Sequence, residues 1–410
     1  YYYVVMVVLY EYWPLALSLA AVALLAVIAL RRRRRGTGAA AAPSPRAGAG
    51  PTPDGQSRVP ILPFLVWWVV LSWFAYSIAG ERMPWLTVHI TLPMILLSGW
   101  LVGRVLEGLD WRRLAERRAW WLGLLAVALL LALDYLGWTL GQGPFAGYEL
   151  EPLRASGRLW GAIVLVGALG AGLAYRAWRS GKRVVLSVAA LLTLLLGSIA
   201  TLRTAWRFCY VNYDYPSEPL VYAHGAPGVN EVMRRLDLLS RRTAGGRYTL
   251  RVAYASEGRT FFYWQLRNYP NATYIGENPS REDVDVPAII AGEEEWAKIE
   301  PYLGDDYVVY TFPYLWWPIE DYRDLTFGRI WRALTDPARR AVLWEIWWNR
   351  DYGRYSELTG KVLTLDRWPY PYRKDVHLYV HRERAAQVLS LIHISEPTRL
   401  LSISYAVFCL

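Results

Sequence analysis

The chain has 410 residues, of which 54% are hydrophobic and only 20% are charged, and its formal net charge is +10. Soluble domains carry about 25% charged residues, so this composition excludes fibrous, disordered and disulfide-scaffold classes and predicts membrane segments joined to a soluble part. The two cysteines, Cys209 and Cys409, cannot build a disulfide framework or a zinc cluster. The basic residues lie between apolar runs instead of on one polar face, so no nucleic-acid partner is expected.

Both ends of the chain depart from what a natural terminus looks like. Residue 1 is Tyr and lies inside an apolar run, which predicts a fragment that lacks its natural N-terminus. Residues 389–399 and 403–410 resemble translations of two pieces of a sequencing-library adapter, in the right order. We therefore predict that 389–410 is an adapter-derived artefact and leave it out of the fold expectations. The alternative is a genuine short tail.

Six apolar runs are long enough to cross a membrane, which takes about 20 mostly apolar residues. The first run could begin as early as Tyr3, in which case Pro14 would kink it. A run of small residues, 167–172, lies within the fifth run and predicts close helix packing there. The six predicted spans are 14–30, 59–78, 87–105, 119–136, 159–175 and 184–204.

The charge of the short loops predicts the orientation of these spans, because cytoplasmic loops are enriched in Lys and Arg. Loops 31–58, 104–118 and 176–183 hold seven, five and four basic residues, whereas the alternate loops hold only Arg82, Arg154 and Arg158. We therefore expect the Arg-rich loops in the cytoplasm and everything after about residue 205 outside. Loop 31–58 opens with five arginines and continues in Ala, Gly, Pro and Ser, so it is predicted to be disordered.

The sequence predicts a transmembrane bundle over 1–204 and an extracytoplasmic α/β domain over 205–388. After residue 204, charged and turn residues return and strand patterns alternate with helical ones, which favours a largely parallel sheet. The predicted strands are 220–223, 248–253, 272–275, 288–291, 307–312 and 376–380. The predicted helices are 227–240, 261–267, 293–302 and two Trp-rich helices, 326–334 and 337–349.

The most informative motif is Gly-Glu-Arg-Met-Pro-Trp at 80–85, at the outer end of two spans. Charged residues there need water, a partner or a lipid headgroup. Pro84 suits a helix start and Trp85 an interface, and the Arg82 guanidinium could hold a lipid phosphate with two hydrogen bonds. The alternative is an ordinary hairpin in which Glu81 and Arg82 pair and Trp85 is an anchor.

The segment 77–107 resembles polytopic GT-C glycosyltransferases of the protein O-mannosyltransferase type (glycosyltransferase family 39-like). More closely, 80–86 resembles the Gly-Glu-(Lys/Arg)-Met-Pro-Trp-Leu pattern of a prokaryotic family that is annotated with flippase-associated activity and is distantly related to those enzymes. Further similar pieces are 227–239, Trp-Gln-Leu-Arg-Asn-Tyr-Pro at 264–270, Trp-Asn-Arg-Asp-Tyr-Gly at 348–353 and His-Leu-Tyr-Val at 377–380.

The resemblance implies a GT-C-like helical bundle and a polyprenyl-phosphate sugar as donor substrate. It transfers roles at the phosphate end of that donor to Glu81, Arg82, Pro84 and Trp85. Such enzymes carry their catalytic acid in the first outer loop, which would lie upstream of residue 1, so no catalytic residue is assigned. Arg82 in place of Lys keeps the charge but changes the geometry.

Other candidate residues have two interpretations each. His89, one or two turns into a span, could contact the lipid phosphate or be a hydrogen-bonded histidine of the bundle. Trp316 and Trp317, with the tryptophans of 344–348, could stack on sugar rings or could instead pack and anchor a domain that rests on a bilayer. The histidines have no metal-ligand spacing, and no nucleotide or haem motif is present. Asp351 is predicted to lie in a turn.

These observations lead to two hypotheses of function. The first is a membrane glycosyltransferase that moves a sugar from a polyprenyl-phosphate donor to a lipid-linked or protein acceptor on the outer face of the cell membrane. The second is a non-catalytic accessory that translocates or presents lipid-linked oligosaccharides. The partners expected for either are membrane lipid, the polyprenyl-phosphate-linked sugar and other cell-envelope glycosylation proteins.

Overall fold

The computed structural model describes residues 2–36, 60–80, 83–147 and 149–388. The chain divides into two compact units, one over Tyr2–Trp206 and one that begins at Arg207. We call them the helical unit and the sheet unit. The predicted loop 31–58, except for its first residues, and the predicted artefact 389–410 lie outside the described residues.

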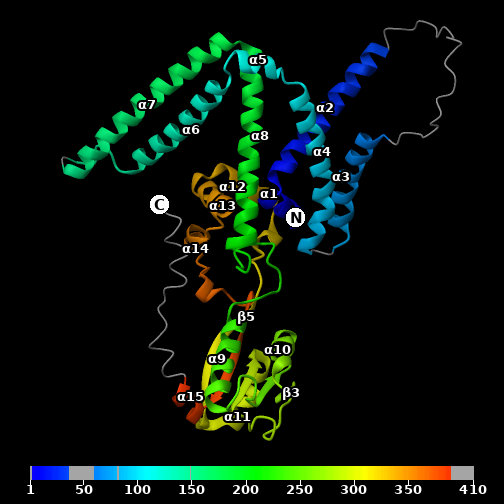
Figure 1. Cartoon of the computed structure of the whole chain (residues 1–410), viewed down its shortest axis with the longest axis vertical. Coiled ribbons are helices and arrows are strands. Elements are labelled where there is room, and N and C mark those ends of the chain that lie inside the picture. Colours follow the sequence, from blue (N-terminus) through cyan, green and yellow to red (C-terminus); the bar gives the residue numbers. More distant parts are fainter. Residues whose placement is uncertain (1, 37–59, 81–82, 148, 389–410) are drawn as a thin grey trace, which may run out of the picture. The chain divides into compact units, whose positions relative to one another are not determined.

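In its described residues the helical unit consists of helices joined by short turns (Figure 1). Six stretches are long and apolar enough to cross a membrane, and each contains one of the six predicted spans or nearly all of it, so six potential spans are confirmed. The helices are α1 (Tyr2–Tyr10), α2 (Tyr12–Gly36), α3 (Ile61–Ile78), α4 (Thr87–Glu107), α5 (Trp111–Glu116), α6 (Trp120–Gly141), α7 (Leu150–Ser180) and α8 (Lys182–Trp206).

Two helix ends differ from the sequence-based expectation, each for a local reason. The break between α1 and α2 falls at Glu11 and not at Pro14, because Pro14 has no N–H to donate to the carbonyl of residue 10. α7 begins at Leu150, well before residue 159. Its first turns are polar and carry an ion pair of Arg154 with Glu151 at 3.1 Å. A criterion based on apolar residues alone cannot detect that extension.

α4 lies against both α2 and α3, whereas α6 and α7 form a long hairpin of their own (Figure 1). The buried side chains Ala21, Leu65, Leu97 and Leu101 form the contact among α2, α3 and α4. The Ser98 hydroxyl lies 2.7 Å from the Met94 carbonyl oxygen and 3.1 Å from the Pro14 carbonyl oxygen, and so adds a polar contact between α4 and α2.

Close helix packing occurs at a different glycine from the one that the sequence suggested. A Cβ on Gly197 of α8 would lie 2.2 Å from the Trp13 ring of α2, so these helices meet where only glycine fits. A Cβ on Gly167, Gly170 or Gly172 would meet nothing within 4 Å. The prediction of close packing over 167–172 is therefore wrong, because these glycines face open space.

The sheet unit contains one six-stranded mixed sheet with the order β1-β5-β6-β4-β2-β3. β2 is parallel to β3 and β4, but β4–β6, β5–β6 and β1–β5 are antiparallel, so the expectation of a largely parallel sheet is wrong. The strands are β1 (His224–Gly225), β2 (Val252–Ala255), β3 (Ala272–Gly276), β4 (Ala288–Gly292), β5 (Tyr307–Trp316) and β6 (Arg373–His381).

Two strands explain where the prediction failed. β5 and β6 are long antiparallel neighbours, and the chain returns between them through an excursion of small helices and not through a crossover helix laid on the sheet. The predicted strand 220–223 is a loop, because Ala223 has φ +47°, a left-handed conformation that a strand cannot contain. The two residues that follow form β1 instead.

Helices cover both faces of this sheet. Because side chains alternate between the two faces, neighbouring residues of one strand belong to different buried clusters. Val252, Tyr254 and Ile290 belong to one buried cluster with α9, α10 and α15, whereas Ala253 and Ile289 belong to a second cluster with α11. The helices of this unit are α9 (Gly228–Thr243), α10 (Arg259–Gln265), α11 (Glu293–Leu303), α12 (Phe327–Thr335), α13 (Pro337–Asn349), α14 (Gly353–Thr359) and α15 (Arg382–Val388). The short single-turn helices of this unit are Arg207–Val211, Leu266–Asn268, Gly304–Asp306, Asp321–Asp324 and Leu365–Arg367.

Gly228, the first residue of α9, provides a test of this sheet–helix contact. A Cβ on Gly228 would lie 2.1 Å from the Pro313 carbonyl oxygen of β5, and a backbone atom cannot move aside cheaply. We expect Gly228→Ala to reduce the free energy of unfolding by about 1–3 kcal/mol, seen as a lower thermal unfolding midpoint. The control is Gly328→Ala in α12, where a Cβ meets nothing within 4 Å and should leave the midpoint unchanged or raise it. Equal midpoints for the two variants would contradict the close approach.

Candidate functional site

The predicted lipid-phosphate motif lies in the turn between α3 and α4. Gly80 turns the chain with φ +72°, and Glu81 and Arg82 lie outside the described residues. The chain then forms a 3₁₀ turn, Pro84–Leu86, that leads directly into α4. Pro84 is the first residue of that turn, where its fixed φ and missing N–H are tolerated, and it is buried. Trp85 is 60% exposed, as an interfacial aromatic residue should be.

His89 lies in the first turn of α4, on the exposed side of that helix. Its ring stacks on Tyr76 of α3 at 5.5 Å between centroids, with 14° between the planes. Tyr3 of α1 in turn meets Tyr76 edge-on at 6.0 Å. The aromatic side chains therefore join α1, α3 and α4 beside the turn, so His89 has a packing role in the bundle and also keeps an exposed imidazole.

The two tryptophans predicted to stack on sugars lie at the end of β5. Trp316 is only 3% exposed, and its Nε1–H donates to the Asp214 carbonyl oxygen at 2.8 Å. A ring so deeply buried has no free face for a sugar, so the structure does not support a stacking role for Trp316. Trp317 is half-buried, and its carbonyl oxygen accepts a hydrogen bond from Trp368 Nε1 at 2.8 Å.

Exposed aromatic side chains gather on the hairpin of α12 and α13. Phe327, Trp331 and Trp344 are 81%, 60% and 57% exposed. Trp344 and Trp348 stack at 5.8 Å on the same helix. These side chains, and not Trp316, present apolar surface to the surroundings, in line with the anchoring interpretation.

The Trp-Asn-Arg-Asp-Tyr-Gly stretch, one of the pieces behind the family resemblance, forms a structural corner. Arg350 ends α13 in the left-handed conformation, with φ +52°, and donates from Nε to Glu218 Oε2 at 2.8 Å. Both side chains are buried, and Asn212 Nδ2 donates to the other carboxylate oxygen of Glu218 at 2.7 Å. The Asp351 carboxylate accepts from the Gly353 N–H at 2.8 Å, which agrees with its predicted place in a turn.

The His-Leu-Tyr-Val stretch forms part of β6, where His377 stacks face to face on Trp296 of α11 at 3.5 Å. The His377 Nδ1 atom lies 3.0 Å from the Tyr379 hydroxyl, which donates to Glu300 Oε1 at 3.2 Å. Burial lowers the pKa of His377 below its ordinary value of 6.5, although the nearby Glu300 and Asp375 carboxylates act in the opposite direction.

Sequence analysis missed a cluster of carboxylates where the parallel strands β2 and β4 end. Glu257 Oε2 accepts from the first-turn N–H of Glu294 in α11 at 3.0 Å, and Glu257 Oε1 accepts from Lys374 Nζ at 2.6 Å. Glu295 Oε1 accepts from the Glu257 N–H at 3.2 Å. A Cβ on Gly292 would lie 2.3 Å from Glu257 Oε2, so glycine is required there. The run of three glutamates directly after a buried strand was the available signal.

This cluster caps the start of α11 and leaves one polar atom unsatisfied. Glu295 is 1% exposed, and its Oε2 has no hydrogen-bond partner among the described residues. Burial raises the pKa of Glu295, although the hydrogen bond that it accepts from the Glu257 N–H acts in the opposite direction. No group of three or more His, Cys, Asp or Glu side chains in the described part of the chain could hold a metal ion.

Comparison of the chain with protein-family models, with curated proteins and with solved structures finds no match. The GT-C and flippase-associated resemblance therefore stays a prediction based on the short motifs. The described residues bring Trp85 and His89 to one end of α4, whereas Trp316 and Trp317 belong to the other unit.

The lowered pKa of His377 predicts a pH-dependent stability. Between the lowered pKa and 6.5 the unfolded chain binds more protons than the folded chain. The contribution of the neutral His377 to stability is therefore complete above pH 6.5 and falls as the pH drops below that value. We expect His377→Phe, which keeps a ring against Trp296, to reduce the loss of thermal stability between about pH 7.5 and pH 5.5. Thermal unfolding of both proteins at each pH measures the effect. Equal losses in the two proteins would contradict it.

Proposed function

We propose that this chain acts on polyprenyl-phosphate-linked sugars at the outer membrane–water boundary, as a GT-C-like glycosyltransferase whose acceptor is lipid-linked or a protein. The observation that carries the proposal is the exposed Trp85 in the tight turn at the start of α4, three residues after Arg82 in the sequence. α3 and α4, two of the helices long and apolar enough to cross a membrane, flank this turn, which supports a position at a span end. The short motif that includes these residues supports the donor class.

In this proposal the turn binds the phosphate end of the donor. The Arg82 guanidinium holds the phosphate oxygens with two charge-assisted hydrogen bonds, and Glu81 orients that guanidinium. Trp85 fixes the depth of the turn in the interface, since its indole prefers the headgroup level. His89, with an exposed ring on the same helix, lies within one turn of Trp85 and offers a further donor to the phosphate.

A second function shares the same binding step without the chemistry. A non-catalytic accessory for translocating or presenting lipid-linked oligosaccharides needs the lipid-phosphate site but no acid or base. The resemblance of 80–86 to a family with flippase-associated activity is the observation that supports this alternative. Binding of the donor without turnover in the full chain would select it.

The proposal requires the turn and the sheet unit to lie outside, and Cys209 offers a probe of that side. Cys209 is exposed and lies in the single-turn helix Arg207–Val211 that follows α8. We expect a membrane-impermeant maleimide to label Cys209 in intact spheroplasts that express a Cys409→Ser variant, because the loop charges favour an outer position for this end. A matched probe is Glu116→Cys in the same variant with Cys209 also changed to Ser, which should react only after permeabilisation. The reverse pattern would refute the outer-face assignment.

A substitution of Arg82 tests the donor site itself. We expect Arg82→Ala to weaken binding of undecaprenyl-phosphate mannose to the purified chain by about tenfold or more, the loss typical of a charge-assisted hydrogen bond. Arg82→Lys should recover part of the affinity, since it restores the charge but not the two parallel hydrogen bonds. Arg154→Ala is the control, because Arg154 lies in the other predicted outer loop and pairs with Glu151. Unchanged affinity in Arg82→Ala would overturn the donor-site proposal.

A further inference from the structure

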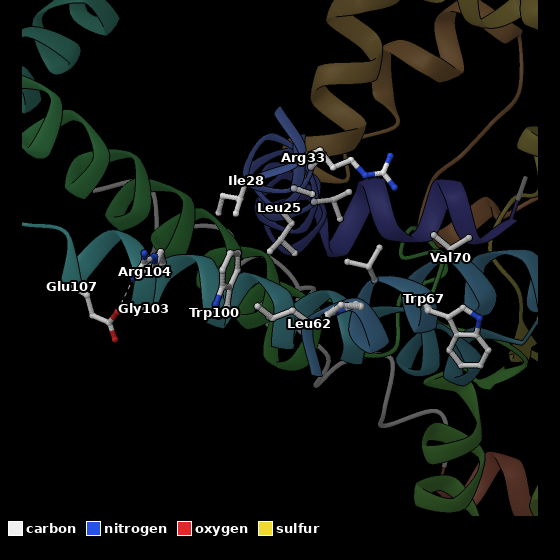
Figure 2. A pocket seen from close by; sticks show the side chains of 15 residues that line it. Leu25, Ile28, Arg33, Leu62, Trp67, Val70, Trp100, Gly103, Arg104 and Glu107 are labelled. Atoms are coloured by element: carbon white, nitrogen blue, oxygen red, sulfur yellow. Dashed lines mark ion pairs between the residues drawn. The ribbon is translucent and has the colours of Figure 1, made fainter. Parts of the chain in front are cut away.

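A large groove lies among α2, α3 and α4, at the end of these helices opposite the Trp85 turn. Its volume is about 1260 Å³, and Figure 2 shows Leu25 and Ile28 of α2, Leu62 of α3 and Trp100 of α4 around it. The three helices meet at Ala21, Leu65 and Leu97, and the groove opens beyond that contact. Its volume exceeds the roughly 300–1,000 Å³ of a small-ligand pocket, so it suits long chains better than a compact solute.

The groove is apolar along its walls and charged at its rim. Among the described residues, the charged side chains that line it are Arg33 of α2 and Arg104 and Glu107 of α4. Arg104 and Glu107 lie 3.9 Å apart, and both side chains are more than half exposed, so this ion pair is weak and can open to a ligand (Figure 2). The remaining lining side chains are aliphatic or tryptophan, with glycine at position 103.

The bilayer determines what such a groove can hold. α4 has 21 residues and is therefore about 30 Å long, which matches the hydrocarbon thickness. Trp85 precedes its first residue and Arg104 lies in its last turn, so the groove rim and the turn lie at opposite membrane surfaces. The arginines of the short loops put the groove rim in the cytoplasmic leaflet, where anionic phospholipids are concentrated.

We propose that this groove binds one anionic phospholipid of the cytoplasmic leaflet, with its acyl chains along the apolar walls and its phosphate at Arg104. An apolar cleft with cationic side chains at its headgroup end is complementary to such a lipid in both polarity and charge. Glu107 opposes the anion and sets the strength of the preference. This site is independent of the proposed sugar donor, which would bind at the other end of α4.

Gly103 allows the acyl-chain part to be tested without disturbing the helix. A Cβ on Gly103 would meet nothing within 4 Å, so Gly103→Leu places a side chain in the groove. Gly99 lies one turn earlier on α4, also faces open space and does not line the groove, so Gly99→Leu is the matched control. Leucine is the better helix former at both positions.

The experiment measures lipid retained by the full chain, by native mass spectrometry after release from vesicles of equal dioleoyl phosphatidylglycerol and dioleoyl phosphatidylcholine. We expect one phosphatidylglycerol to be retained preferentially by the original chain and by Gly99→Leu, and to be lost in Gly103→Leu. Retention of both lipids alike, or equal retention by the two leucine variants, would overturn the proposal. So would a loss of thermal stability in Gly103→Leu without lipid loss, because a protein segment would then fill the groove.

Neutral substitutions of Arg104 and Glu107 at the rim are expected to change the preference for phosphatidylglycerol in opposite directions. Arg104→Gln should reduce the preference for phosphatidylglycerol by about tenfold, since a charge-assisted hydrogen bond is lost. Glu107→Gln should increase that preference, because it removes the competing carboxylate. Arg112→Gln is the control, since Arg112 lies in the adjacent loop, pairs with Glu116 at 3.1 Å and does not line the groove. A change of equal size in Arg112→Gln would show mere surface charge and would refute the site.

Discussion

The contact of α4 with α2 and α3 is the constraint on which both candidate sites depend. α4 begins beside Trp85 and ends at the groove rim, so one helix carries features at both of its ends. Buried Leu97 and Leu101 hold it against its neighbours, and the Ser98 hydroxyl contacts the Pro14 carbonyl of α2. Lipid offers no hydrophobic driving force between helices, so close side-chain contacts and such polar contacts set the position of α4.

In the sheet unit, buried polar groups hold elements together more than they form an open site. Glu257 and Glu295 link the ends of β2 and β4 to the start of α11, and Arg350 with Glu218 fixes the corner after α13. Removal of one partner of such a buried ion pair strongly destabilises the fold, because the other charge is left buried without compensation. Two motif pieces behind the family resemblance, around Arg350 and His377, therefore have a structural explanation that is independent of any activity.

The sequence was sufficient for the features that depend on local composition. All six potential spans follow from the length of apolar runs, and most strands and helices of the sheet unit follow from periodicity. Features set by tertiary contact were missed or misassigned. No periodicity distinguishes the parallel β2–β4 pair from the antiparallel β4–β6 pair, or shows that Gly197 and not 167–172 meets another helix. For Trp316 the sequence left stacking on a sugar and packing as alternatives, and the buried ring, with its hydrogen bond to Asp214, supports packing.

The contact of Gly197 with Trp13 has a consequence for how this protein can change over time. Because the indole lies where a Cβ would stand, any side chain at position 197 must displace that ring or push α8 away from α2. The two positions are therefore coupled: a larger residue at 197 is tolerated only together with a smaller one at 13. In related sequences, residues 13 and 197 should therefore be conserved together or substituted together. Where both are substituted, we expect α2 to be rotated about its axis, because a different side chain then faces α8.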